Sequence, residues 1–196
     1  MNYPLSLSFK VLTFFGQQMT MRDARGEVVY YVKQKAFKLK EDVLVYADEA
    51  QTKLAYRMQA DRILDISAAY NITLPDERSA GSLKREGMKS FWKATYQIKD
   101  SAGADIGVIH EENPWMKALE FLLGEIPILG TVAGYVINPA YLVEMPAGRP
   151  LVRVQKRASI FERSFRIELI STPSLAQETL LFPAILMMVL LERGRG

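Results

Sequence analysis

Two clusters of basic residues are the features of this sequence best suited to bind a ligand. The larger cluster has only Glu162 within it and Glu168 just after it as acidic residues, and its members are Arg149, Arg153, Lys156, Arg157, Arg163 and Arg166. The second cluster surrounds Phe91 and Trp92 and consists of Lys84, Arg85, Lys89 and Lys93. Such groups bind phosphates or anionic membrane surfaces, and each charge contributes about 1 kcal/mol near such a surface. We therefore predict an anion or lipid head-group patch at each cluster, with a solvated outer face as the ordinary alternative.

The single histidine, His110, is a candidate for acid–base or metal chemistry, whereas carboxylate pairs such as Asp61 and Asp65 cannot be assigned a catalytic role without geometry. A Ser-His-Asp triad would need it, but the sequence has no Gly-x-Ser-x-Gly elbow, and His110 alternates with Val108 as an ordinary strand position. A metal site with Glu111 and Glu112 is unfavourable, because adjacent strand residues point to opposite faces. Glycine-rich nucleotide-binding motifs are also missing. We predict a protein that is not an enzyme, without catalytic residues, metal or cofactor.

Composition indicates one folded domain over residues 1–196. Hydrophobic residues make up 49% and charged residues 24% of the chain, which are ordinary globular values. Cysteine is absent, which excludes a disulfide framework and a thiolate zinc site and fits a reducing compartment. The start, MNYPLSLSFKVLTFFG, lacks the pattern of a secretory signal, so we expect a cytoplasmic protein. A net charge of +3 is too small to predict nucleic-acid binding.

A repeated hairpin pattern supplies the elements that would carry these residues. The first copy, GEVVYYVKQKAFKLKEDVLVYA, has alternating apolar positions on both sides of a short link. Further copies occupy residues 52–74, 81–100 and 148–169, and a weaker one begins at Asp105. No strand is followed by a clear crossover helix, so the pattern favours an antiparallel sandwich or barrel over a parallel sheet.

Alternation within the last copy shows that its strands have one apolar face. Val152 and Val154 share a face, and Arg153, Gln155 and Arg157 share the other. Ten or more such strands would close naturally into a barrel, which removes the exposed edges of an open sheet.

An insertion at about residues 114–139 interrupts the fourth copy and moves its return strand to Ala140–Glu144. Residues 115–123 have helical spacing, and no charged residue occurs from Ile126 to Val143. Two prolines and two glycines make this segment a poor membrane-spanning helix. We interpret it as a helix and loop that cover one barrel end, with contact to a membrane surface as the alternative.

The C-terminal stretch LLFPAILMMVLL predicts a buried helix over residues 174–193. Ser174 and Gln177 form a capping box, and Pro183 should kink or restart the helix. A helix that crosses a bilayer needs about 20 apolar residues, and the run from Leu180 to Leu191 has twelve, so it is poorly suited to be a membrane anchor. Because the helix is apolar on every side, it must be buried on every side. A barrel of strands with one apolar face provides that enclosure.

Taken together, the hairpins, the segment DSAGADIGVIHEEN, the closing GRPLVRVQKRASIFERSFRIEL and the terminal apolar helix resemble the tubby C-terminal-like superfamily. Within it, the chain is most similar to LURP-one-related and phospholipid-scramblase-like proteins. The resemblance is a pattern of order and spacing that covers nearly the whole chain. It implies a mainly β fold, a closed antiparallel barrel of about twelve strands around a buried hydrophobic C-terminal helix. Tubby proteins bind phosphoinositides and scramblase-like members act at membranes.

The chain also departs from the membrane-anchored scramblases. It lacks a spanning segment and a cysteine-rich palmitoylation stretch, so lipid translocation is not implied, and no phosphoinositide-binding motif transfers residue by residue. We expect a non-enzymatic binding or scaffold domain that recognises anionic lipid or phosphate groups as a peripheral membrane protein. The alternative is a protein-interaction module that docks a protein partner through the 114–139 insertion.

Overall fold

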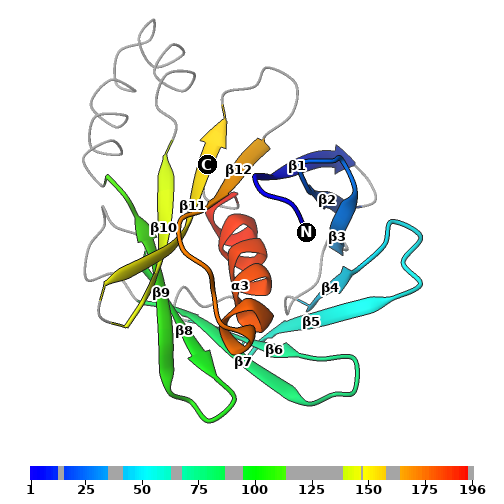
Figure 1. Ribbon diagram of the computed structural model, residues 1–196. Helices are drawn as coiled ribbons and strands as arrows, with labels where there is room; N and C mark the ends of the chain where they lie inside the picture. Colours follow the sequence, from blue (N-terminus) through cyan, green and yellow to red (C-terminus); the bar gives the residue numbers. More distant parts are fainter. Residues whose placement is uncertain are drawn as a thin grey trace, which may run out of the picture.

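The computed structural model describes residues 1–12, 16–34, 42–62, 68–86, 95–113, 139–146, 148–157 and 164–193. Within these residues, twelve antiparallel strands form one closed barrel around a helix (Figure 1). The strands are β1 (Leu5–Leu12), β2 (Gly16–Arg22), β3 (Val28–Gln34), β4 (Asp42–Tyr46), β5 (Leu54–Ala60), β6 (Ala69–Thr73), β7 (Ser79–Arg85), β8 (Thr95–Asp100), β9 (Asp105–Glu111), β10 (Ala140–Met145), β11 (Arg149–Arg157) and β12 (Ser164–Leu169). The helix is α3 (Leu175–Arg193).

Each strand pairs with the next one in the sequence, and β12 pairs with β1 to close the barrel. The predicted fold class is therefore confirmed, including the return strand β10 after the insertion. The hairpin of β1 and β2 was not among the five copies recognised in the sequence. Leu5, Leu7 and Phe9 alternate as the buried residues of β1, and this alternation is the signal that could have found it. The 114–139 insertion lies outside the described residues except at its last position.

The helix α3 fills the interior of the barrel, as its apolar sequence predicted. Every residue from Leu180 to Leu190 is buried, and Figure 1 shows α3 in the middle of the ring of strands. The predicted capping box is present: the Ser174 amide donates to Gln177 Oε1 at 2.8 Å, and the Gln177 amide donates to Ser174 Oγ at 3.4 Å. α3 continues through Pro183 as one element. None of the helices in the described part of the chain is long and apolar enough to cross a bilayer.

A glycine lets α3 approach the wall closely at β7. A Cβ atom placed on Gly81 would lie 2.2 Å from the Lys99 carbonyl oxygen and 2.9 Å from Leu180 Cδ1. Its φ of +148° is also a backbone conformation that other residues rarely adopt. Gly81 therefore fixes the packing of β7 against both its neighbour strand and the helix.

The barrel has two chemically different ends. At the first, which we call the turn end, tight turns at residues 23–27, 47–53, 74–78 and 101–104 join the strands, and α3 begins. At the opposite end α3 finishes, and Glu192 enters a polar cluster. Because α3 crosses the whole barrel, its start lies beside Ile98 on β8 and Met145 on β10, and its end meets Tyr96 and Tyr141 at the other end of the same two strands.

The cluster at the opposite end ties the helix to the wall. Tyr96 on β8 and Tyr141 on β10 donate to the Glu192 carboxylate at 2.5 and 3.1 Å. Burial, and next the nearby Glu192, raises the pKa of both phenols well above the usual range. Arg85 lies 5.9 Å from the Tyr96 ring centre, and Glu111 is buried on the neighbouring strand. These polar contacts fix the far end of α3 to the wall.

Candidate functional site

The larger basic cluster lies mainly on two neighbouring strands, and carboxylates already neutralise part of it. Arg153 on β11 pairs through Nε with Glu112 Oε2 at 2.8 Å. Arg166 on β12 pairs through Nε with Glu168 Oε1 at 2.6 Å. Both pairs are partly exposed, so each is a weak interaction, yet each lowers the net positive charge that a ligand would meet.

The remaining members of this cluster do not converge on one point. Arg149 and Arg157 begin and end β11, so their backbones are about 26 Å apart at the usual rise per residue. Lys156 takes the inward-facing position of the alternation and pairs with Phe165. Arg163 lies outside the described residues. Among the described members, Arg166 is opposite Gln155 and is therefore a diagonal neighbour of both Arg153 and Arg157 across the β11–β12 ladder.

The second cluster is divided between the two faces of β7. Lys84 is exposed on the outer face, whereas Arg85 is turned toward Tyr96 inside the barrel. Lys89 and Lys93 lie outside the described residues. Of this predicted patch, the described part of the chain therefore contributes one outward-facing cation.

A polar groove on the outer wall of β1, β2 and β3 is a site that sequence reasoning missed. It has a volume of about 450 Å³ and is lined by Ser8, Lys10, Gln18, Thr20, Arg22, Tyr31 and Glu49. The strand register explains its chemistry, since Ser8 is opposite Thr20 and Thr20 is opposite Tyr31. Three hydroxyl-bearing side chains thus form a row across three strands, where they can donate to one ligand.

Charge is unevenly distributed along the groove. Near the turn end, Arg22 pairs with Glu49 and also donates to the Gly26 carbonyl, so this side is close to neutral. Away from the turn end, Lys10 is opposite Gln18, and Gln18 is opposite Lys33. Neither lysine has an ion pair within the described ranges. The groove therefore combines a row of hydroxyl groups with a cationic side.

Arg157 connects the groove to the basic cluster predicted from the sequence. It is opposite Ser164, which is in turn opposite Ser8, so two strand spacings, about 10 Å, separate its backbone from the groove. Arg157 is exposed and has no ion pair to any part of the chain that the structure describes. Lys10 and Lys33 thus place positive charge on the side of the hydroxyl row away from the turn end, and Arg157 places it beyond Ser8.

His110 lies on the outer face of β9, where both of its ring nitrogens have partners. Its Nε2 is 3.1 Å from Glu144 Oε2, and its Nδ1 is 3.0 Å from the Glu111 carbonyl oxygen. Glu111 points into the barrel and Glu112 pairs with Arg153, as expected for neighbours on a strand. Among the residues with described positions, no group of three or more His, Cys, Asp or Glu could hold a metal.

Comparisons with family models, curated proteins and solved structures gave no match to this chain. The resemblance to tubby-like proteins therefore rests on the sequence pattern alone and stays a prediction.

Proposed function

We propose that this protein is a non-enzymatic binding domain that recognises phosphate-bearing anionic groups on the outer wall of its barrel. In this proposal the closed barrel is a rigid scaffold, and the protein acts in the cytoplasm as a peripheral protein at anionic membrane surfaces. The site is the groove over β1, β2 and β3, extended by Lys33 and Arg157. The same chemistry would bind a lipid head group or a free polyphosphate.

The observation that carries the proposal is the combination of donors in the groove. Ser8, Thr20 and Tyr31 offer hydroxyl groups in one row, and Lys10 offers an ammonium group beside them. Phosphate oxygens accept several hydrogen bonds at once, and bonds from charged donors are about twice as strong as neutral ones. Burial, and next the nearby Glu49, raises the pKa of Tyr31, so this phenol stays protonated as a donor at neutral pH.

The filled interior supports recognition on the outer wall. The side chains of α3 occupy the volume in which other barrels hold a ligand, and Leu180 to Leu190 are all buried. A ligand inside would have to displace the helix. The outer wall offers a groove of sufficient size without any such rearrangement.

Binding assays on the full chain test the proposal. We would measure co-sedimentation with phosphatidylcholine vesicles that contain phosphatidylserine or a phosphoinositide, and titrate inositol hexakisphosphate calorimetrically. Lys10→Glu should weaken binding about tenfold, because it replaces an attractive charge with a repulsive one. The vesicle and soluble arms distinguish a head group from a free phosphate.

A matched pair of variants on β11 provides the control. Arg157→Glu should also weaken binding, whereas Arg149→Glu, at the other end of the same strand, should leave it unchanged. Both side chains are exposed, so both variants should fold. Binding that Lys10→Glu and Arg157→Glu leave unaltered, or indifference to every phosphate-bearing probe, would refute the proposal.

A further inference from the structure

An ion pair between Arg22 and Glu49 closes the turn-end side of the proposed anion groove. Both side chains line the groove, and Arg22 Nη2 donates to Glu49 Oε1. The strand register places Arg22 two residues beyond Thr20 on the same face of β2, opposite Ser6 of β1. The row of hydroxyl groups therefore ends beside a cation that a carboxylate of the same chain already occupies.

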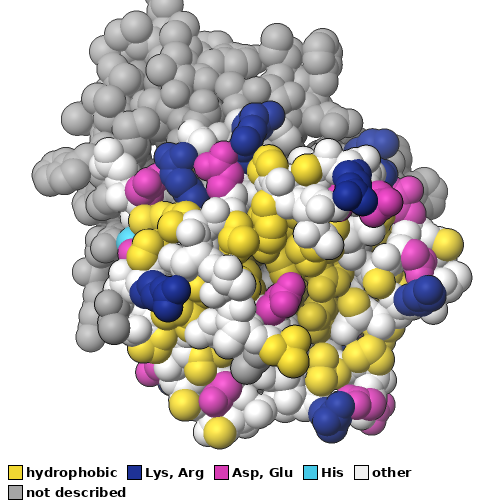
Figure 2. Space-filling model, in the orientation of Figure 1, with side chains coloured by type: hydrophobic (Ala, Val, Ile, Leu, Met, Phe, Trp, Pro, Cys, Tyr) yellow, Lys and Arg dark blue, Asp and Glu magenta, His cyan; other side chains and the backbone are white. Residues whose placement is uncertain are grey.

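The position of this pair distinguishes it from other ion pairs on the barrel surface. Figure 2 shows Lys and Arg side chains next to Asp and Glu side chains at several places along the edge of the molecule. The pair of Arg78 and Asp76 is one example, and it does not line the groove. Arg22 and Glu49 both line it, together with the hydroxyl row. A ligand in the groove would therefore contact this pair directly.

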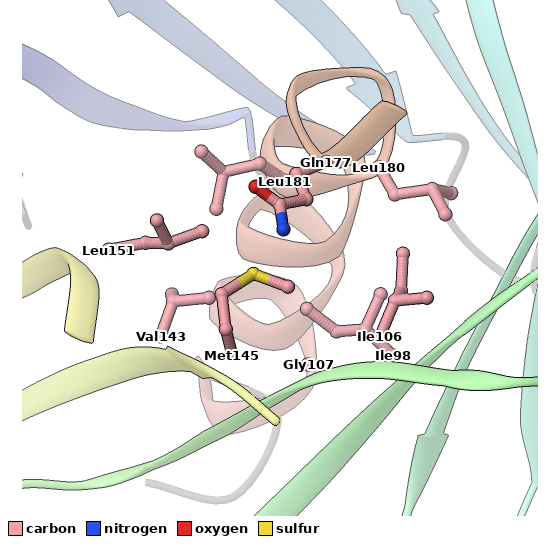
Figure 3. Close-up of a pocket in the computed structure, with 9 residues that line it drawn as sticks. All are labelled: Ile98, Ile106, Gly107, Val143, Met145, Leu151, Gln177, Leu180 and Leu181. Atoms are coloured by element: carbon pink, nitrogen blue, oxygen red, sulfur yellow. The ribbon is translucent and has the colours of Figure 1, made fainter. Parts of the chain in front are cut away.

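The apolar niche beside the start of α3 offers no comparable place for an anion. It is lined by apolar side chains from the strands and from α3, and by Gln177 (Figure 3). Its free space is about 10 Å³, which is room for one water-sized group. Moving a charged group into such surroundings without a charged partner is unfavourable. The groove, with about 450 Å³ and its own cations, is the better place for a charged ligand.

Arg22 is held in place by a contact that does not involve Glu49. Its Nη1 donates to the Gly26 carbonyl oxygen at 3.1 Å. Gly26 belongs to the turn of residues 23–27, where the buried Asp23 carboxylate accepts two backbone amide hydrogen bonds at 2.8 and 3.2 Å. The guanidinium should therefore keep its position when Glu49 moves away, and its Nη2 would then offer a charged donor to the groove.

Glu49 combines a fixed backbone with a side chain that can move away. It belongs to the turn of residues 47–53, where the Asp48 carboxylate accepts hydrogen bonds from the Thr52 and Lys53 amides, each at 2.9 Å. The Glu49 side chain is 49% exposed, and within the described ranges its carboxylate has no second partner. An exposed ion pair contributes about 0–1 kcal/mol, so breaking this one costs little.

The Glu49 carboxylate also lies close to the hydroxyl row. Burial is the main cause that raises the pKa of the Tyr31 phenol, and the nearby Glu49 carboxylate adds to it. Glu49 thus places its negative charge next to both the Arg22 guanidinium and a phenol that can donate. An anionic group of a bound ligand would take the same position.

We propose that Glu49 is an internal competitor of the ligand, and that Arg22 becomes a further anion-binding residue once Glu49 has moved. This inference rests on the proposed anion site in the groove. Binding exchanges one ion pair for another: Arg22 Nη2 turns from the Glu49 carboxylate to a phosphate oxygen, and the Glu49 side chain turns into solvent. About 13 Å of β2 separates Arg22 from Gln18, the partner of Lys10, so a ligand that contacts both cations carries more than one anionic group.

The competitor makes the site selective. A singly charged anion gains too little from Arg22 to displace Glu49, whereas a phosphate monoester, with a charge of about −1.5 to −2, forms stronger charge-assisted hydrogen bonds. A polyphosphate already held at Lys10 also reaches Arg22 at a high effective concentration. We expect the groove to favour multiply phosphorylated ligands over chloride or isolated carboxylates.

Calorimetric titration of inositol hexakisphosphate into the full chain measures this competition. Glu49→Gln should tighten binding by up to about fivefold, which corresponds to the removal of an ion pair of about 1 kcal/mol. Arg22→Gln should weaken binding. Adding Glu49→Gln to Arg22→Gln should then give little or no further change, because the pair is already broken. Salt at about 0.15 M screens the more distant charges.

Glu27→Gln is the matched control, since Glu27 is an exposed acidic residue of the neighbouring turn that does not line the groove. It should leave the affinity unchanged. Suppose that the wild type binds and that Lys10→Glu weakens binding. If Glu49→Gln then has no effect, tightens binding equally with and without Arg22, or acts no differently from Glu27→Gln, the inference is overturned while the proposed site stands. If neither the wild type nor Glu49→Gln binds any phosphate probe, the proposed site fails as well.

Discussion

Leu186 lies inside the barrel at the middle of α3, and its replacement by alanine tests whether this helix is the core of the fold. The side chain is 0% exposed, whereas Leu175, on the first turn of the same helix, is 82% exposed. Leu186→Ala and Leu175→Ala remove the same side-chain atoms, and leucine and alanine differ little in helix propensity. The difference between them reports burial alone.

The expected magnitude follows from how α3 is enclosed. Replacing a buried leucine by alanine costs about 2–5 kcal/mol, and the cost is larger where the surroundings cannot collapse into the cavity. Strands joined into a closed barrel surround α3, so we expect about 3–5 kcal/mol for Leu186→Ala. Leu175→Ala should change stability by less than about 0.5 kcal/mol.

Equilibrium unfolding in guanidinium chloride, followed by circular dichroism, gives both free energies. For a domain of this size each kcal/mol corresponds to about 2–4 °C in Tm, so thermal melts should separate the variants clearly. Leu186→Asp, which buries an unpaired carboxyl group, should prevent folding altogether. A folded Leu186→Asp protein, or equal small losses in both alanine variants, would show that α3 is not the core.

Other predictions concern the wall, the helix cap and the buried phenols. Gly81→Ala should lower the free energy of unfolding by more than about 2 kcal/mol, because the alanine Cβ would overlap a carbonyl oxygen on the next strand. A melting curve like that of the wild type would contradict this. Ser174→Ala should cost about 0.5–2 kcal/mol in the same assay, and Ser174→Asp should restore most of it. The pKa values of Tyr30, Tyr96 and Tyr141 are raised by burial, so the folded state keeps protons that the unfolded state loses above about pH 10. Below pH 10 these three phenols should not change the free energy of unfolding. Above pH 10 they should lower it by up to about 4 kcal/mol per pH unit. Full ionisation of all tyrosines in the folded state near pH 10 would refute this.

Local patterns were sufficient to predict most of the fold. Strands such as β11 show their buried face directly, because Val152 and Val154 alternate with polar residues. The all-round apolar character of α3 required an enclosure, and the hairpins provided it. The hairpin of β1 and β2 was overlooked because β2, GQQMTMR, offers only Met19 and Met21 as apolar positions.

The candidate site was less accessible to sequence reasoning, because it depends on strand register. Arg153 and Glu112 pair across 41 residues, so the clustering of arginines along one strand did not reveal which were neutralised. The groove unites Ser8, Thr20 and Tyr31 from three strands with Glu49 from a turn. None of these residues forms a recognisable motif, and only the register of β1, β2 and β3 places the three hydroxyl groups in one row.

The pairing of β1 with β12 has a consequence for the order of events in folding. Most neighbouring strands are close in sequence and can pair locally, but Leu5 meets Ile167 only after nearly the whole chain is in place. Closing the wall before α3 has entered would leave an empty apolar interior. We therefore expect early, local hairpins and one late, cooperative step in which the helix docks and the final ladder forms.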